Sequence, residues 1–448
     1  MADRLDNARR TLIVGLGRTG LSVARYLSRH GVPVAIVDSR DAPPALEELR
    51  TALPADVALF LGGFREGAFE RAEQIIVSPG VALSNPLIAA ARARGIPVIG
   101  DIELFARVAV APVVAITGSN GKSTVTTLLG AMAQQAGLVA RTGGNIGMPA
   151  LDLIEETEPD LYILELSSFQ LETTRSLKPV AAVVLNISAD HMDRYSDLGA
   201  YAAAKQGIYH QAGVQVVNAD DPVAAALADP QRTVVHFTRD VPAPGEYGIC
   251  LEQDIPWIAH GEHPILPVSE IGLSGTHNIM NALAALALGE VVGLPRQAMV
   301  ETLREFHGLP HRMQLVARRR GVRWYNDSKG TNVGATLAAI DGVAGRVVLI
   351  AGGDAKGADL APLAAAMRDK GRAAVLLGRD APRLQAVLPE GLPVERAADM
   401  AEAVHRAAAL AQAGDTVLLS PACASTDMYR DYQERGAVFS AAVRGLEP

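Results

Sequence analysis

The sequence has very little cysteine: only Cys250 and Cys423 occur among its 448 residues, far apart in the chain. Two distant cysteines form neither a disulfide framework nor the ligand spacing of a zinc site. A reducing compartment suits such a chain, so we expect it in the cytoplasm. Residues 1–10 are polar and charged and lack the apolar core of a secretion signal.

Long basic runs and long apolar runs are also missing. The formal net charge is −8, and without a basic run we expect no nucleic-acid partner. No apolar stretch approaches the roughly 20 residues needed to cross a bilayer, so we expect no membrane insertion. Hydrophobic residues make up 49% and charged residues 20%, the balance of a folded globular protein. We expect a monomer that acts on small molecules.

Strand-like and helix-like segments alternate along three blocks, which we place at residues 1–109, 110–309 and 310–448. This alternation predicts an α/β fold with doubly wound, mostly parallel sheets. Apolar runs predict strands at 12–14, 34–37, 57–61, 75–77, 98–99, 113–117, 161–164, 180–185, 214–217, 347–351, 373–377 and 416–419. Residues 247–274, with several Pro and Gly, predict a small antiparallel insertion.

Helix-like stretches at 21–29, 86–94, 123–136 and 278–292 lie between predicted strands. Gly31, Gly95 and Gly137 follow the first three of these stretches. A glycine just past a helix end takes the left-handed conformation that stops it. These three glycines therefore mark predicted helix ends.

The strongest motif is Thr-Gly-Ser-Asn-Gly-Lys-Ser-Thr at 117–124, between a predicted strand and a predicted helix. Its glycines let backbone N–H groups converge on phosphate oxygens, and the helix start adds partial positive charge. Lys122 can reach the terminal phosphates of ATP, and the hydroxyl of Ser123 or Thr124 can bind Mg²⁺. We expect ATP phosphates to contact Gly118, Ser119, Asn120, Gly121, Lys122, Ser123 and Thr124.

Two residues, not four, separate Gly118 from Gly121, so the loop is shorter than that of generic NTPases. A plain strand–turn–helix with a hydroxyl cap is the alternative interpretation.

A second glycine motif, Gly15-x-Gly17-x-x-Gly20, follows the first strand, and Asp38 lies 18 residues after Gly20. Alone, this pattern indicates a dinucleotide-binding dehydrogenase. Its tight turn, however, accepts any pyrophosphate, including that of a UDP-sugar. With a separate ATP loop in the chain, a UDP-linked substrate is the more economical interpretation, and purely structural glycines are the alternative.

Seven further strings resemble the Mur ligase family, in order and over nearly the whole chain. They are Gly-Gly-Asn-Ile-Gly at 143–147, Leu-Glu-Leu-Ser-Ser-Phe-Gln at 164–170, Asp-His-Met-Asp-Arg-Tyr at 190–195, Gly-Thr-His-Asn-Ile-Met-Asn-Ala at 275–282, Leu-Pro-His-Arg at 309–312, Asn-Asp-Ser-Lys-Gly-Thr-Asn at 326–332 and Ser-Pro-Ala-Cys-Ala-Ser at 420–425. The shortened phosphate loop is similar to that of the same family. The last two strings resemble the members that add D-glutamate, and no Asp-Asn-Pro-Arg string occurs.

This resemblance implies three domains: a Rossmann-like N-terminal domain for the UDP substrate, a central P-loop-type ATPase domain, and a Rossmann-like C-terminal domain for D-glutamate. It implies that ATP phosphorylates the L-alanine carboxylate of UDP-N-acetylmuramoyl-L-alanine. The amine of D-glutamate then attacks the acyl phosphate, a step in peptidoglycan precursor synthesis. Mg²⁺, with Mn²⁺ as a substitute, is the implied metal.

The resemblance also implies roles for single residues. Glu165 joins Ser123 or Thr124 at a first metal. His191, oriented by Asp190 and Asp193, binds a second. Lys205 resembles a lysine that becomes a carbamate and so gains metal-binding oxygens, although its helical spacing alone indicates an ordinary surface lysine.

Further contacts are implied by the same resemblance. Those for ATP are Asn278, Asn281, Arg312, Asp327 and Lys329. Those for the UDP substrate are Arg18, Thr19, Gly20, Asp38, Ser39, Arg40, Gly80 and Asn145, where Asn145 also helps hold the second metal or the acyl phosphate. Those for D-glutamate are Thr331, Lys356, Ser425, Thr426 and Tyr432, with a helix expected to start near Ser425.

Two other functions stay open at this point. One is a different amide ligase of the superfamily, such as a folylpolyglutamate synthase. The other is a UDP-sugar sensor without catalysis, although such a sensor is expected to lose reactive residues that this chain keeps.

Overall fold

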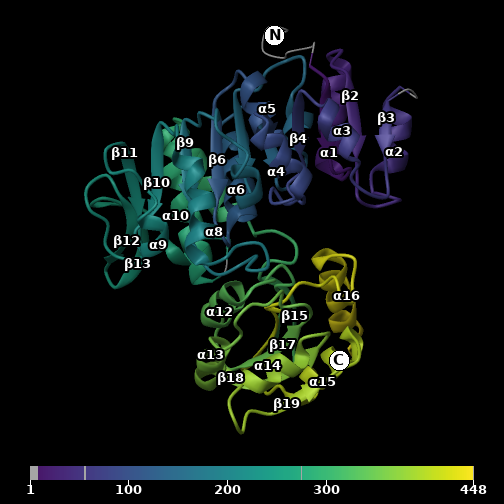
Figure 1. Ribbon diagram of the computed structural model, residues 1–448. Coiled ribbons are helices and arrows are strands. Elements are labelled where there is room, and N and C mark those ends of the chain that lie inside the picture. The colour runs from purple at the N-terminus through teal and green to yellow at the C-terminus, as the bar shows by residue number, and fades with distance from the viewer. Residues whose placement is uncertain (1–8, 55–56, 274, 447–448) are drawn as a thin grey trace.

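The computed structural model describes residues 9–54, 57–273 and 275–446. Residues 1–8 of the polar N-terminal segment and Ser274, the predicted end of the antiparallel insertion, lie outside the described residues. Three β-sheets follow one another along the chain, each covered by helices, and the third lies below the other two in Figure 1. This confirms the predicted α/β class.

The first sheet has five parallel strands in the order β3-β2-β1-β4-β5. Its strands are β1 (Thr11–Val14), β2 (Val34–Val37), β3 (Ala58–Phe60), β4 (Gln74–Val77) and β5 (Val98–Ile99). Its helices are α1 (Arg18–Arg29), α2 (Leu46–Ala52), α3 (Glu66–Arg71), α4 (Pro86–Ala93) and α5 (Asp101–Val108). The order reverses beside β1, so the carboxyl ends of β1 and β4 border a crevice suited to a ligand.

The second sheet has nine strands in the order β14-β13-β12-β11-β10-β9-β6-β8-β7. Its strands are β6 (Val113–Thr117), β7 (Ala140–Gly144), β8 (Leu161–Glu165), β9 (Ala181–Val184), β10 (Val214–Asn218), β11 (Thr233–Phe237), β12 (Tyr247–Glu252), β13 (Ile255–His260) and β14 (His263–Pro267). The last three pair antiparallel, as predicted, and β12 extends the parallel part of the sheet from β11.

Helices cover this central sheet on both faces. The α-helices are α6 (Lys122–Gln135), α7 (Ser168–Leu171), α8 (Leu198–Gln206), α9 (Pro222–Ala225), α10 (Thr276–Val291) and α11 (Arg296–Glu305). Three short 3₁₀ helices occur at Ala150–Leu153, Gly207–Tyr209 and Val268–Glu270.

The third sheet has the order β15-β16-β20-β17-β18-β19 and is parallel except for the hairpin of β15 and β16. Its strands are β15 (Gln314–Arg319), β16 (Val322–Asn326), β17 (Val347–Gly352), β18 (Gly371–Leu377), β19 (Val394–Arg396) and β20 (Thr416–Leu419). Its helices are α12 (Val333–Gly342), α13 (Leu363–Lys370), α14 (Ala381–Val387), α15 (Met400–Leu410) and α16 (Tyr432–Gly445). The predicted strands at 347–351, 373–377 and 416–419 are present, whereas the hairpin was not predicted.

The three helix-ending glycines have positive φ angles, +71° at Gly31, +81° at Gly95 and +83° at Gly137, which confirms those helix ends. The first helix begins at Arg18 rather than at residue 21. Thr19 and Gly20 therefore belong to its first turn and not to the loop before it.

The first two sheets share a hydrophobic core, whereas the third has cores of its own. Phe105 from α5 packs edge-on against Tyr162 of β8, with ring centroids 5.1 Å apart. This continuous apolar contact fixes the first sheet on the second. The limits at residues 109 and 309 stay a prediction. Across the described ranges, no helix combines the length and apolar character that crossing a membrane requires.

Candidate active site

The loop between β6 and α6 has the backbone conformation of a phosphate cradle. Gly118 and Gly121 have φ angles of +150° and +84°. A Cβ at Gly121 would lie 2.3 Å from Oδ1 of Asn281, so only glycine fits there. Lys122 Nζ donates to the carbonyl oxygens of Gly118 (2.8 Å) and Ser119 (2.9 Å). Its ammonium is thus held over the loop, the position that the predicted contact with terminal phosphates requires.

Lys205 of α8 lies under this loop rather than on the surface. Its side chain is only 1% exposed, and its Nζ donates to the Gly118 carbonyl oxygen at 2.9 Å and to Thr117 Oγ1 at 3.3 Å. Burial, with the charge of Lys122 next, lowers its pKa well below the usual value, despite Asp190 and Glu165. Such an amine loses its proton far more readily than a surface lysine.

Glu165 ends β8 beside the phosphate loop and is 2% exposed. Its Oε1 accepts a hydrogen bond from Asn145 Nδ2 at 2.7 Å, and its backbone carbonyl accepts one from the Asn145 N–H at 2.8 Å. Its other oxygen, Oε2, is buried without a hydrogen-bond partner. A buried carboxylate oxygen without a partner is costly unless a cation binds it.

His191 stands at a strained point of the chain, with a φ angle of +56°. Its ring packs edge-on against Phe169, and its Nε2 lies 3.8 Å from Oδ2 of Asp190. Burial lowers the pKa of His191, an effect that Asp190 opposes and Lys356 and Lys122 reinforce. The imidazole is therefore neutral near pH 7, the form that binds metals.

The third domain reaches the phosphate loop through two side chains. Arg312 Nη2 donates to Ser123 Oγ at 2.8 Å. Asn332 Nδ2 donates to Asn120 Oδ1 (3.2 Å) and to Asp190 Oδ2 (3.3 Å). Asn332 was not among the predicted site residues, although it closes the Asn-Asp-Ser-Lys-Gly-Thr-Asn string; the same side chain caps α12.

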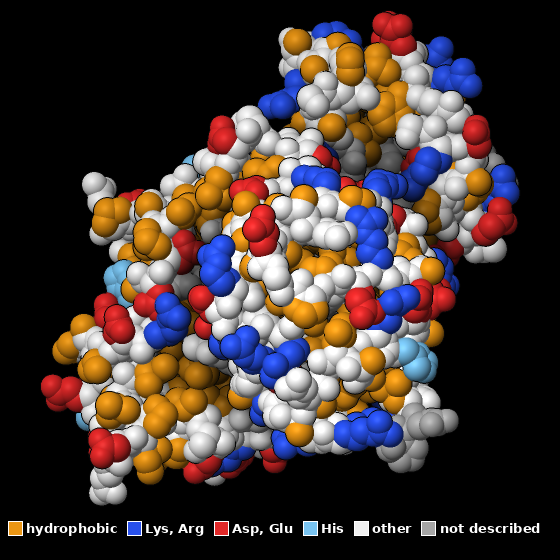
Figure 2. Space-filling view, turned by 90° about the horizontal axis from the view of Figure 1, so that it is seen from below, with side chains coloured by type: hydrophobic (Ala, Val, Ile, Leu, Met, Phe, Trp, Pro, Cys, Tyr) orange, Lys and Arg blue, Asp and Glu red, His pale blue; other side chains and the backbone are white. Residues whose placement is uncertain are grey.

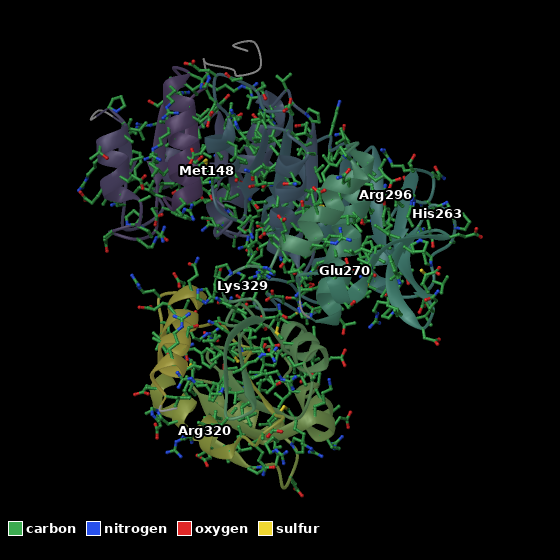
Figure 3. All side chains as sticks on the ribbon, turned by 180° about the vertical axis from the view of Figure 1, so that it is seen from behind. Met148, His263, Glu270, Arg296, Arg320 and Lys329 are labelled. Carbon is green, nitrogen blue, oxygen red and sulfur yellow. The ribbon has the colours of Figure 1, made fainter. Side chains whose placement is uncertain are left out.

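Asp327 and Lys329 follow β16 at the carboxyl edge of the third sheet. Burial raises the pKa of Asp327 to about 7, against hydrogen bonds from Ser420 Oγ and the Met313 N–H and the charge of Arg312. Burial, then Arg312 and Lys122, lowers the pKa of Lys329 to about 8. Lys329 Nζ lies 4.2 Å from the centre of the Tyr432 ring, and Figure 3 places it at the end of the third domain that faces the second.

A cavity of 510 Å³ opens between the second and third domains. Its lining includes eight of the predicted ATP residues: Asn120, Gly121, Thr124, Asn278, Asn281, Arg312, Asp327 and Lys329. Asn281 Nδ2 donates to Asn278 Oδ1 at 3.0 Å, so both amides are oriented. The volume suits a nucleotide.

A second cavity, of 440 Å³, lies between the first and second domains. It collects seven of the eight residues predicted for the UDP substrate: Arg18, Thr19, Asp38, Ser39, Arg40, Gly80 and Asn145. Arg18 spans the two domains through a 2.5 Å hydrogen bond to the Gly147 carbonyl oxygen. Toward the upper right of Figure 2 the surface is hollowed, with Lys and Arg side chains along the rim of the hollow.

Two residues near this second cavity hold its turn together. Gly20 does not line the cavity; a Cβ on it would lie 2.0 Å from the Gly15 carbonyl oxygen, so it permits close packing of α1 on β1. Asp38 accepts hydrogen bonds from the Leu16 N–H and from Arg40. Burial opposes ionisation, yet these hydrogen bonds prevail and lower the pKa of Asp38 to about 2.

The residues predicted for D-glutamate lie in loops of the third domain, apart from Tyr432 at the start of α16. The expected helix start near Ser425 is wrong. Residues 425–429 form one turn, closed by the Tyr429 N–H on the Ser425 carbonyl oxygen (2.8 Å), and α16 begins only after Asp431 caps it. No helix N-terminus is therefore available at Ser425 for a carboxylate.

Among the residues that the structure describes, no three His, Cys, Asp or Glu side chains converge on one cation position. The predicted metal roles of Glu165 and His191 therefore require ligands of other kinds, such as the predicted Ser123 and Thr124 hydroxyls or a carbamate on Lys205.

A phosphate-binding loop in the middle one of three α/β domains, with a nucleotide-sized cavity on either side, defines the class of ATP-dependent ligases with separate sites for two substrates. The chain belongs to the Mur ligase family. Residues 9–100 match the profile "Mur ligase MurD-like, N-terminal domain", residues 116–289 the "Mur ligase middle domain" and residues 311–423 the "Mur ligase, glutamate ligase domain".

Curated relatives share about half of the sequence or more. The chain is 57% identical to "UDP-N-acetylmuramoylalanine--D-glutamate ligase" of Nitrosococcus oceani, over 97% of this chain and 96% of the relative. It is 51% identical to the protein of the same name from Methylococcus capsulatus, over 99% and 96%.

Solved structures share the fold at low sequence identity. UDP-N-acetylmuramate-alanine ligase MurC from Thermotoga maritima aligns with a TM-score of 0.60 at 18% identity, over 97% of this chain and 99% of that one. A pseudomurein peptide ligase type C from Methanothermus fervidus gives 0.59 at 19% identity, over 92% and 96%. The resemblance to the Mur ligases and the three-domain architecture are confirmed; the roles of single residues stay predictions.

Proposed function

We propose that this chain uses ATP to join D-glutamate to the L-alanine carboxyl group of UDP-N-acetylmuramoyl-L-alanine, a step in peptidoglycan precursor synthesis. The supporting observation is a chain of interactions that leads from the UDP-side cavity to the phosphate loop, whose Gly121 and Thr124 line the other cavity. Asn145, which lines the UDP-side cavity, hydrogen-bonds Glu165, and the charge of Glu165 acts on Lys122 of the phosphate loop. The two alternatives are a folylpolyglutamate synthase and a sensor without catalysis. Neither is favoured, because relatives that are 57% and 51% identical to this chain are named as D-glutamate ligases.

The reaction needs two steps because a free carboxylate is a poor electrophile. First, an alanine carboxylate oxygen attacks the γ-phosphorus of ATP, and ADP leaves. Then the amine nitrogen of D-glutamate attacks the acyl carbon, phosphate leaves with the bonding electrons, and the nitrogen loses a proton. Bringing these anions together is the main task of the protein.

Two cationic side chains neutralise the phosphates in this proposal. Lys122 reaches the β- and γ-phosphates from the loop. Arg312 already touches Ser123 beside the loop and moves onto the transferring phosphoryl group. Closure of the third domain on the second keeps water from the acyl phosphate.

Mg²⁺ fits this site, since Glu165 presents a buried oxygen without a partner and its charge acts on Lys122, which directly precedes the hydroxyl residues Ser123 and Thr124. When bound, Mg²⁺ or Mn²⁺ offsets the charge of the phosphates. A second ion would take His191 and Lys205 as ligands. For Lys205, the neutral amine adds to CO₂, forming a C–N bond and releasing one proton, which yields a carbamate with metal-binding oxygens.

At the other two sites, the proposal assigns the UDP portion to the cavity of Arg18 and Asp38. D-glutamate would bind in the third domain near Thr331, Lys356, Ser425, Thr426 and Tyr432. Lys356 supplies a charge for a carboxylate, and its interaction with His191 brings that loop near the phosphate site.

The test is ADP release by the purified chain with ATP, Mg²⁺ and UDP-N-acetylmuramoyl-L-alanine, comparing D-glutamate with L-glutamate. We expect release with the D-isomer alone and at least a ~100-fold loss of turnover in Lys122→Ala. Release only with a folate and L-glutamate would overturn the proposal.

A further inference from the structure

A third cavity, of 580 Å³, lies in the third domain, away from both cavities described above. It is bounded by the turn between β15 and β16 and by the ends of α15 and α16. Its lining residues are Arg319, Arg320, Val322, Trp324, His405, Ala408, Ala409, Ala411, Gly445 and Leu446. Its volume falls in the range of small-molecule sites.

This cavity lies at the opposite end of the domain from the phosphate site. β16 leads from Val322 at the cavity to Asn326, next to Asp327 of the ATP cavity. α16 runs from Tyr432, beside Lys329, to Gly445 at the third cavity, and its 14 residues span about 21 Å. Figure 3 shows Arg320 at one end of the domain and Lys329 at the other. A ligand here cannot share the ATP site.

The chemistry of the lining is that of an anion site. Two guanidinium groups and one imidazole border the cavity, and its described lining contains no Asp or Glu. Arg319 already donates to the carbonyl oxygens of Leu446 and of Arg444 (2.8 Å for the latter), which fixes its guanidinium at the cavity. His405 Nδ1 bonds the Ala401 carbonyl oxygen at 2.8 Å, which leaves Nε2 for another partner. A local cluster of cations is notable in a chain of net charge −8.

A second observation points the same way. Trp324 lines the cavity, is 2% exposed, and its indole N–H is buried without a hydrogen-bond partner. A buried N–H without an acceptor destabilises the folded state. A shift of the indole ring toward the cavity on binding would let a ligand oxygen supply that acceptor, while the arginines neutralise the charge of the ligand.

We propose that this cavity binds a small organic phosphate. Two arginines together suit a dianion better than a single carboxylate, because two positive charges beside the cavity can neutralise two negative charges on one ligand. The apolar wall of Val322, Ala408 and Ala409 suits the organic part of the ligand. This inference does not depend on the proposed ligase activity.

The binding test uses the full chain with Lys122→Ala, which disables the phosphate loop, and Trp257→Phe, which leaves Trp324 as the one tryptophan. Glucose 6-phosphate, inorganic phosphate, sulfate and citrate are titrated at constant ionic strength while Trp324 fluorescence is followed. We expect a saturable change with glucose 6-phosphate and weaker binding of the other three. No saturation, or equal saturation by sulfate or citrate, would overturn the proposal.

Two matched variants distinguish specific binding in the cavity from a general effect of positive surface charge. Arg320→Gln removes a charge from the cavity lining, whereas Arg318→Gln removes the same charge from an exposed neighbour outside the lining. Calorimetry should show that Arg320→Gln weakens glucose 6-phosphate binding about 10-fold and Arg318→Gln less than about 2-fold. Equal weakening by both would contradict a specific site. Because Arg320 lies far from the phosphate loop, ligase turnover of Arg320→Gln should match that of the unsubstituted chain.

Discussion

The proposed second metal site depends on the side-chain amine of Lys205. Since Lys205 is buried and its pKa is lowered, it is available to react with CO₂. We expect Lys205→Arg, which keeps a cation but forms no carbamate, to lower turnover at least ~100-fold. Removing CO₂ and bicarbonate should lower turnover of the unsubstituted chain, and added bicarbonate should restore it. The exposed Lys178→Arg is the control; a fully active Lys205→Arg chain would refute the role.

The raised pKa of Asp327 predicts that the free energy of unfolding depends on pH. Burial raises its pKa in the folded state to about 7, whereas the unfolded value is about 4. Between these values the folded state holds the proton and the unfolded state does not, so this group's contribution to stability falls as pH rises from about 4 to 7. Asp327→Asn should therefore raise the free energy of unfolding by more than about 1 kcal/mol at pH 8 and by much less at pH 4.5. Urea unfolding at the two pH values measures this, and an equal change at both would contradict it.

Single residues show where sequence reasoning stopped. The phosphate loop was predicted because its glycines, lysine and hydroxyls are consecutive. The burial of Lys205 was not, since it arises only when α8 packs under a loop that ends more than 80 residues earlier. Asn332 was likewise missed as a site residue, because its contact with Asn120 joins two domains across 212 positions.

At the scale of single elements, the packing of α1 on β1 leads to a prediction about stability. A Cβ at Gly20 would lie 2.0 Å from the Gly15 carbonyl oxygen, whereas one at Gly17 would meet nothing within 4 Å. Gly20→Ala must push the helix from the strand, so we expect a loss of about 3 kcal/mol in the free energy of unfolding. Gly17→Ala should change it by less than about 0.5 kcal/mol. Thermal unfolding compares the two, and a Gly20→Ala chain as stable as Gly17→Ala would show that the turn relaxes easily.

Elements were predictable where a local pattern decides them. Buried parallel strands read as apolar runs, and glycines mark the helix ends. The hairpin of β15 and β16 was missed because arginines (Arg318, Arg319 and Arg323) lie within its strands. Neither strand therefore shows the apolar run that marks β17, β18 and β20. The false helix start at Ser425 has a different cause: residues 425–429 form a single turn, and the helix begins only after the Asp431 cap six residues beyond Ser425.

At the scale of the molecule, polar contacts hold the third domain on the second, whereas a shared apolar core joins the first two. Polar contacts can exchange partners, so the third domain is the part that can move when ligands bind. Arg312 is central to this prediction, since in the proposed reaction its hydrogen bond to Ser123 is replaced by contacts with phosphate oxygens. We expect Arg312→Ala to lower turnover by about 100-fold.

The same variant should lose the compaction that small-angle scattering detects in the unsubstituted chain with a non-hydrolysable ATP analogue, Mg²⁺ and UDP-N-acetylmuramoyl-L-alanine. Asn332→Ala removes the other side-chain contact of the third domain with the phosphate loop without touching Ser123, so it should retain most of the ligand-induced compaction while losing about 1 kcal/mol of stability from its helix cap. If Arg312→Ala compacts as fully as the unsubstituted chain, closure does not depend on this arginine and the phosphate transfer must be organised by the phosphate loop alone.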